Sequence, residues 1–210
     1  GNRRFLPIRT IKVDFEGLDI DAMTISSHKI YGPQGIAALI VNKKIDLFPH
    51  MQGGGQERGL RSGTENIAAI IGFGKACERS SQNIVTFNEK VKHLNAILEK
   101  ALFDLGAVIF CKESHRLSNT TFFSFKNIDG STLLTALDRK GFAIASGSAC
   151  SSKSSEPSHV LLSMGVDLDL AQGALRVSLG LESTENEIND FIETLKDEVN
   201  RLKQLTAVAA

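Results

Sequence analysis

Apolar and polar positions in the first part of the chain form short segments that predict strands and turns. Residues 21–26 and 36–41 are compact apolar runs of strand length, and the link between them, residues 32–35, is rich in glycine and proline. Glycines then cluster in residues 53–63, which predicts a loop defined by its backbone rather than regular structure. We therefore expect two buried strands with a tight connection, followed by an ordered loop.

Apolar residues recur at helical spacing over residues 67–105, and the polar residues 80–83 interrupt this periodicity. The pattern predicts a long helical connector that is broken at that point. We place a domain boundary near Ser80. Residues 1–80 are then the remnant of a larger sheet domain, and residues 81–210 form a small C-terminal α/β domain.

The rest of the chain alternates strand-like and helical segments, which is typical of a layered α/β unit. The expected strands are residues 107–110, 120–125, 142–145 and 174–179, and the expected helices are residues 130–140 and 184–202. The last helix begins with a capping box, residues 184–187, in which a hydroxyl and a carboxylate each accept a backbone N–H group. We expect residues 107–205 to form one compact layer of sheet and helices.

The composition favours small molecules or proteins as partners. The chain has 210 residues, 42% of them hydrophobic, and its 24 Lys and Arg balance its 24 Asp and Glu. No segment concentrates basic residues as a nucleic-acid or anionic-membrane surface does. No apolar run approaches the ~18 residues that span a bilayer, and residues 1–10 lack the apolar region of a signal peptide. We therefore expect a cytoplasmic protein that binds neither nucleic acid nor membrane.

The three cysteines, Cys77, Cys111 and Cys150, show no CxxC spacing, so we expect neither a disulfide framework nor a metal site. Cys77 and Cys111 lie in apolar stretches, which favours inert thiols. Cys150 lies in a run of small polar residues, 145–155, with Lys153 nearby, which suits a mobile loop and a reactive thiolate. We expect Cys150 to be the most readily alkylated thiol, and an inert role is the alternative.

Lys29 is the candidate for covalent cofactor chemistry. It follows the first predicted strand in the segment SSHK, residues 26–29, beside a turn. Strand ends present side chains to crevices, where a lysine amine can form a Schiff base with an aldehyde cofactor. Ser26 and His28 could then bind phosphate or a substrate group. On this spacing alone, a solvated turn lysine is the alternative.

Two arginine-bearing segments are candidates for anion binding. In GGGQERGLRSGT, residues 53–64, glycines bring backbone N–H groups together, and two arginines, Ser62 and Thr64 add donors. The alternative there is an ordinary surface loop. Arg176 lies in an apolar strand, where a guanidinium is costly to bury without an anion and pairs bidentately with a carboxylate. An intrachain ion pair is the alternative for Arg176.

In their order along the chain, the four segments resemble those of the NifS-like cysteine desulfurases, which have the aminotransferase-type pyridoxal-phosphate fold. SSHKIYGPQG resembles the family's cofactor-lysine motif, GGGQERGLRSGT its glycine-arginine loop, SGSACSS its catalytic-cysteine loop and ALRVSLG its substrate-arginine strand. The resemblance covers nearly all of residues 13–201. It implies an α/β protein of the type I fold of pyridoxal-phosphate (PLP) transferases, with a partial large domain and a smaller α/β C-terminal domain.

The resemblance also implies a role for each cofactor-binding candidate. Lys29 would hold pyridoxal 5′-phosphate covalently, while Ser26 and His28 would contact the cofactor phosphate or the substrate. Thr64 would reach the phosphate across a homodimer. The chemistry suits the residues, because a lysine amine makes and breaks the bond to the aldehyde and the cofactor ring takes up electrons.

Arg176 and Cys150 receive substrate roles from the same resemblance. Arg176 would bind the carboxylate of L-cysteine, and Cys150 would take the sulfur as a persulfide while L-alanine leaves. The long, serine-rich cysteine loop resembles the branch of the family that passes sulfur to iron–sulfur scaffold proteins. The alternatives are a catalytically inactive fragment that serves partner docking or dimerisation, and a selenocysteine lyase.

The first residues of the chain depart from the family. Its members supply an Asp to the pyridine nitrogen and a Gln to the ring oxygen from a strand before the lysine, and a stacking His from earlier still. Counting back to that strand leads to residues 2–6, which hold none of these residue types, and residues 1–11 do not resemble the family. We therefore expect a truncated or rearranged product, or a fragment, that binds the cofactor poorly and releases little sulfide by itself.

Overall fold

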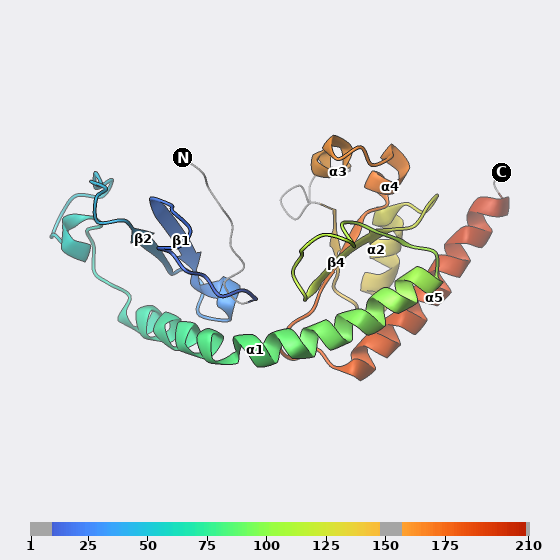
Figure 1. Ribbon diagram of the computed structural model, residues 1–210, viewed down its shortest axis with the longest axis horizontal. Coiled ribbons are helices and arrows are strands. Elements are labelled where there is room, and N and C mark those ends of the chain that lie inside the picture. The colour runs from blue at the N-terminus through green and yellow to red at the C-terminus, as the bar shows by residue number, and fades with distance from the viewer. Residues whose placement is uncertain (1–9, 148–156, 209–210) are drawn as a thin grey trace. The chain divides into compact units, whose positions relative to one another are not determined.

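The structure is a computed structural model that describes residues 10–147 and 157–208 (Figure 1). Of the helices in these ranges, none combines the length and the apolar character that a bilayer span requires. The helices are α1 (Ile67–Asp104), α2 (Gly130–Arg139), α3 (His159–Ser163), α4 (Leu168–Gln172) and α5 (Glu185–Val208). The strands are β1 (Ala22–Ser26), β2 (Ala37–Val41), β3 (Val108–Ile109), β4 (Thr120–Ser124), β5 (Ala145–Ser146) and β6 (Leu175–Ser178).

The chain divides into two compact units, residues 1–86 and residues 87–210. The division falls inside α1, which therefore contributes its first half to one unit and its second half to the other. The boundary that we placed near Ser80 also lies inside this helix. Our interpretation of the units as part of a large domain and a small domain remains a prediction.

The first unit contains a two-stranded antiparallel sheet, β1 and β2, as the two apolar runs predicted. The strands are in register from Ala22 opposite Val41 to Ser26 opposite Ala37. A single 3₁₀ turn, Ser27–Ile30, follows β1 directly and begins the connection to β2. The sheet therefore ends at the segment that carries the candidate lysine.

Helix α1 is continuous, so the predicted break at residues 80–83 is wrong. Residues 81–83 are exposed on the helix surface, and two of them bond within the helix. The Nδ2 atom of Asn83 donates to the carbonyl oxygen of Arg79 at 2.9 Å, and the Nε2 atom of Gln82 donates to Oε1 of Glu78 at 3.4 Å. With neither glycine nor proline in the stretch, nothing in the backbone stops the helix.

The second unit contains a four-stranded antiparallel sheet in the order β3-β4-β6-β5. Side chains alternate between its two faces along β4. Phe123 packs into the main core with α1, α2 and α5, whereas Phe122 packs on the other face with residues of α3 and α4. The unit is therefore layered, with helices on both faces of the sheet. Its main core is made by Val91, Leu94, Leu98, Leu102, Phe123, Leu133, Leu137, Leu175, Leu195 and Val199, among others.

Three of the four strands predicted for this unit are confirmed in shortened form as β3, β4 and β6. The predicted strand over residues 142–145 is wrong for most of its length, because only Ala145 pairs with β6. Phe142 instead packs its ring against Phe191 of α5, with the ring centroids 5.3 Å apart. Phe142 and Ile144, which are half-buried against the core, therefore made this segment resemble a strand without a strand's backbone pairing.

Helix α2 approaches the backbone before β6 so closely that only glycine fits at its first residue. A Cβ atom at Gly130 would lie 2.8 Å from the carbonyl oxygen of Gln172 and 2.9 Å from the carbonyl carbon of Gly173. We expect Gly130→Ala to lower the free energy of unfolding by about 1 to 2 kcal/mol, because overpacking outweighs the gain in helix propensity. Urea unfolding measures this effect.

Gly74 offers the matched control, because it lies in α1 and a Cβ atom added there would meet open space among the described residues. Gly74→Ala should therefore stabilise the chain by up to about 1 kcal/mol through helix propensity alone. Equal effects of the two substitutions would show that the contact at Gly130 is not tight in solution.

Candidate functional site

The 3₁₀ turn after β1 presents Lys29 to solvent from a firmly held backbone. Ser27 and Ile30 of this turn are buried, whereas His28 and Lys29 are exposed. The N–H group of Gly32 donates to the carbonyl oxygen of Ser27 at 3.0 Å and closes the turn. The lysine amine is thus accessible, and it is not desolvated by the residues that the structure describes.

Helix α1 anchors this turn through contacts that the sequence interpretation missed. Ile30 belongs to a small core cluster with Phe73 and Ala76 of the helix. A Cβ atom at Gly72 would lie 2.6 Å from Cγ of Pro33, so glycine is needed where the turn meets the helix. The signal that could have revealed this contact is the pair of small residues Gly72 and Ala76, four positions apart on one helix face.

The glycine-arginine loop, residues 53–64, is held by its own polar side chains. Oε1 of Gln56 accepts the N–H of Gly63 at 3.0 Å, and Oγ of Ser62 accepts the N–H of Gly55 at 3.4 Å. Ser62 is buried, so it holds the loop together rather than offering the anion-binding donor that we expected. The exposed donors are Arg58, Arg61 and Thr64. The expected loop is confirmed apart from one 3₁₀ turn, Glu57–Gly59.

The structure brings together three of the residues that the sequence singled out. Ser26 ends β1, and His28 and Lys29 follow it in the adjoining turn. Thr64 lies in the same unit, at the end of the glycine-arginine loop. Arg176 belongs to the second unit and is described there by itself.

Arg176 lies in the middle of the four-stranded sheet. Its neighbours across the strands are Phe122 of β4 and Ala145 of β5. The side chain is half-buried, and its Nε atom is buried without a hydrogen-bond partner among the described residues. The intrachain ion pair that was the alternative for Arg176 is therefore not formed within residues 10–147 and 157–208. A buried donor without an acceptor lowers the stability of the fold, and this cost is removed when an acceptor forms a hydrogen bond with it.

Cys150 lies outside the described residues, but the strand before it is placed. Strand β5 pairs with β6 so that Ala145 lies opposite Arg176. The segment that carries Cys150 follows β5 directly in the sequence. The topology therefore brings the start of the cysteine segment next to the unpartnered arginine.

The two other thiols are exposed, so the burial that their apolar neighbours indicated is wrong, whereas their low reactivity stays a prediction. Cys111 follows β3 in a turn with φ of 54°, where its side chain leaves the sheet. Cys77 lies on α1, and partial burial raises the pKa of its thiol. Apolar neighbours in the sequence were misleading, because a helix and a turn each point one side chain away from the core.

We expect iodoacetamide to label Cys111 faster than Cys77. The raised pKa lowers the fraction of Cys77 present as the reactive thiolate at neutral pH, whereas Cys111 is exposed on a turn. Peptide mapping after brief treatment measures both rates in one sample. Faster labelling of Cys77 would contradict the placement of these two side chains.

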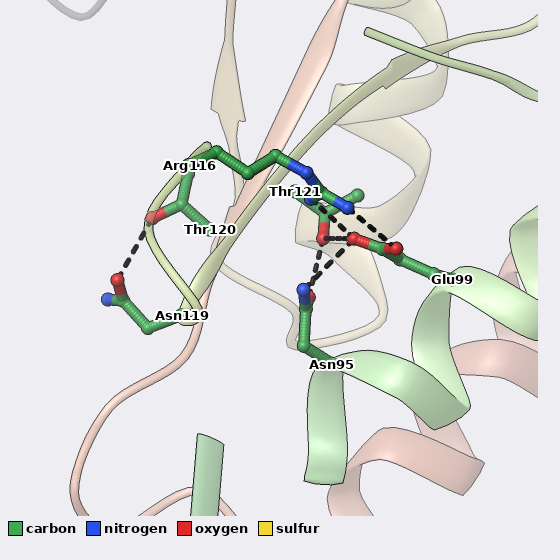
Figure 2. Close-up of polar contacts among 6 residues, drawn as sticks. All are labelled: Asn95, Glu99, Arg116, Asn119, Thr120 and Thr121. Atoms are coloured by element: carbon green, nitrogen blue, oxygen red, sulfur yellow. Dashed lines mark hydrogen bonds and ion pairs between the residues drawn. The ribbon is translucent and has the colours of Figure 1, made fainter. Parts of the chain in front are cut away.

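A polar network, drawn in Figure 2, ties α1 to β4 on the face of the sheet that α1, α2 and α5 cover. The Nη2 atom of Arg116 donates to Oε2 of Glu99 at 2.8 Å, and Nδ2 of Asn95 donates to Oε1 of Glu99 at 3.0 Å. The hydroxyl of Thr121 lies between two acceptors, Oδ1 of Asn95 and Oε1 of Glu99 (3.1 Å from the latter), and its single proton serves one of them at a time. Thr121 precedes Phe122, the cross-strand partner of Arg176, so the network fixes the strand beside the arginine.

Glu99 is ionised within this network. Burial opposes its charge, but the hydrogen bonds from Arg116, Thr121 and Asn95 and the charge of Arg116 outweigh that cost, so the pKa of Glu99 lies below its usual range. The same contact with Glu99 raises the pKa of Arg116. At neutral pH, Glu99 is therefore negatively charged and Arg116 positively charged.

Comparison with known proteins places the chain among enzymes of one kind. Residues 7–191 match the aminotransferase class-V family. The chain is 38% identical over 200 residues to a cysteine desulfurase IscS of Clostridium botulinum. This match covers 93% of this chain and 50% of the relative. The chain is 41% identical to a cysteine desulfurase of a Nostoc species with the same coverage.

Solved structures agree with these sequence matches. A NifS-like protein from Rickettsia africae superposes with a TM-score of 0.82 at 37% identity, and the match covers 92% of this chain and 51% of that one. The chain thus spans about half the length of the relatives it matches. The family match begins at residue 7, so part of the segment 1–11, which we had set apart from the family, belongs to it.

Proposed function

Because the chain belongs to the aminotransferase class-V family, we propose that it carries the cofactor lysine and the catalytic cysteine of a cysteine desulfurase. Such an enzyme releases L-alanine from L-cysteine and retains the sulfur. The observation that carries the proposal is the buried Nε of Arg176, which has no partner among the described residues and lies on the strand paired with β5. A carboxylate such as that of L-cysteine would accept hydrogen bonds from this guanidinium, including its buried Nε–H.

The residues of the first unit fit pyridoxal 5′-phosphate in their chemistry. Lys29 offers an accessible primary amine on an anchored turn, and Ser26 and His28 flank it with a hydroxyl and an imidazole that suit a phosphate or a substrate group. We assign Thr64 to the phosphate of a second copy in a homodimer. When bound, the cofactor accepts the electrons that substrate bond cleavage releases.

Cys150 takes the sulfur in this proposal. Its thiolate attacks the substrate sulfur, so that an S–S bond forms as the bond between Cβ and sulfur breaks. The electron pair of the broken bond ends, with a proton, on the methyl group of L-alanine. The sulfur remains on Cys150 as a persulfide, and Arg176 holds the substrate carboxylate during the transfer.

The persulfide sulfur then passes to an acceptor protein, which we propose is an iron–sulfur cluster scaffold in the cytoplasm. The family names of the relatives support a sulfur acceptor of some kind. We expect the 210 residues alone to work slowly, because residues 2–6 offer no Asp, Gln or His for the cofactor ring.

The test incubates the chain with pyridoxal 5′-phosphate and L-cysteine and measures alanine together with the mass of the Cys150 peptide. We expect slow alanine formation and one added sulfur on Cys150. Cys150→Ala should lose both signals, whereas Cys111→Ala, which removes an exposed thiol, should keep them. Equal alanine formation by Cys150→Ala would refute the proposed role.

Two further outcomes of this experiment separate the alternatives. Complete absence of alanine, with a chain that still folds, would favour a fragment that serves docking or dimerisation. Faster turnover of L-selenocysteine that does not depend on Cys150 would favour a selenocysteine lyase.

A further inference from the structure

A groove of about 560 Å³ lies on the second unit between α2 and α5, and none of its lining residues belongs to β6, the strand that carries Arg176. Arg139 and Lys140, at the C-terminal end of α2, line one side of it, and Arg201 of α5 lines the other. All three side chains are exposed. The groove therefore places three cationic side chains around one concave surface.

Two of these cations have no counter-ion among the residues that the structure describes. Arg139 and Lys140 form no ion pair within this part of the chain. Arg139 also lies in the last turn of α2, where a positive charge is favourable but no carboxylate is supplied. Their charges are thus available to a ligand.

Arg201 is held in position by the neighbouring Glu198. Its Nε and Nη2 atoms both approach Oε2 of Glu198, at 2.8 and 2.7 Å, and Glu198 is itself buried. A guanidinium has five N–H donors, so this contact leaves several of them free. Arg201 is therefore pre-oriented, which reduces the entropy lost when it binds an acceptor.

We propose that this groove is a docking site for an acidic segment of a partner protein. The three cations match carboxylates spaced along a peptide, and the size of the groove suits a few side chains rather than a whole domain. Helix α2 packs against β5, and the Cys150 segment follows β5 in the sequence. A peptide bound in the groove would therefore contact the helix that packs against this strand. The proposal does not depend on the proposed enzymatic function.

An acidic protein segment fits this groove better than a nucleic acid. The chain has a formal net charge of zero, so it lacks the broad positive potential that concentrates a polyphosphate. Glu198 also lines the groove and would repel a continuous run of phosphates more than separate carboxylates that contact Arg139 and Lys140. Discrete carboxylates on a peptide therefore suit the arrangement.

Fluorescence anisotropy with a labelled peptide of alternating glutamate and serine tests the proposal on the full 210-residue chain. We expect the peptide to bind, and its glutamine counterpart not to bind. The double substitution Arg139→Glu with Lys140→Glu should weaken binding about tenfold or more, because attraction becomes repulsion. The control Lys92→Glu with Lys100→Glu changes the net charge equally at exposed positions on α1 and should leave affinity unchanged.

A second variant guards against a folding defect, because a glutamate at the end of α2 opposes the helix dipole. Arg139→Gln with Lys140→Gln should weaken binding about threefold or more while thermal unfolding stays close to that of the unmodified chain. Absence of peptide binding, equal weakening by the control pair, or tighter binding of a single-stranded oligonucleotide than of the peptide would each overturn the proposal.

Discussion

Glu99→Gln is expected to lower the free energy of unfolding at neutral pH by about 2 to 3 kcal/mol, because it leaves the partly buried guanidinium of Arg116 without its counter-ion. The substitution keeps the shape of the side chain, so the loss reports the charge and its hydrogen bonds. Urea unfolding followed by circular dichroism measures it. The control is Glu193→Gln, which removes an exposed carboxylate of α5 and should change stability by less than about 0.5 kcal/mol.

The effect should also depend on pH with a definite sign. The pKa of Glu99 is lowered in the folded protein, so its contribution is fully present above the unfolded value of about 4.3 and is lost as pH falls through the folded pKa. The stability difference between the unmodified chain and Glu99→Gln should therefore narrow below roughly pH 4. A difference that stays constant from neutral to acidic pH would contradict the ionised network.

Arg176→Met and Arg116→Met are expected to change stability in opposite directions, although each removes one guanidinium from the same unit. Arg176 has a buried Nε without a partner among the described residues, so an apolar side chain of similar length should stabilise the fold by about 1 kcal/mol. Arg116 is bonded to Glu99, so its removal should cost about 3 kcal/mol. Thermal unfolding of the two variants measures the contrast.

The expected contrast would identify Arg176 as a residue that lowers the stability of the fold. A buried donor that the fold does not satisfy is typical of a binding site, where the ligand supplies the acceptor. If Arg176→Met destabilises the chain as much as Arg116→Met, the arginine belongs to an internal network, and the assignment to a substrate carboxylate loses its main support.

The strands could be predicted from local pattern, and the long helix only in part. The apolar runs at residues 21–26 and 36–41 became β1 and β2, but the predicted burial of these strands is wrong, because Met23 is the only residue of the two that is buried. The polar residues 80–83 misled the prediction, since polarity also marks the exposed side of a helix. Phe142 misled it in the opposite way, because burial against α5 does not require strand pairing.

The candidate site was predictable where one segment carries the chemistry, and not where distant segments meet. Lys29 and its neighbours form a continuous segment, so the motif and the turn coincide. The contact between Gly72 and Pro33 joins positions far apart in the sequence, and neither residue type reveals its partner. The bond between Glu99 and Arg116 crosses from a helix to a loop for the same reason. Exposure of Cys77 and Cys111 depended on side-chain direction, which apolar neighbours do not determine.

The central claim is that Lys29 is the cofactor lysine of a pyridoxal-phosphate enzyme, and borohydride reduction tests it most directly. The chain is incubated with pyridoxal 5′-phosphate and reduced, and the attachment site is mapped by mass spectrometry, with Lys43 and Lys44 as exposed lysines of the same unit for comparison. We expect partial attachment that favours Lys29 and disappears from that peptide in Lys29→Ala, because in our proposal the anchored turn and its flanking Ser26 and His28 would help to hold the phosphate. Attachment to Lys43 and Lys44 at the same level as to Lys29 would contradict the assignment.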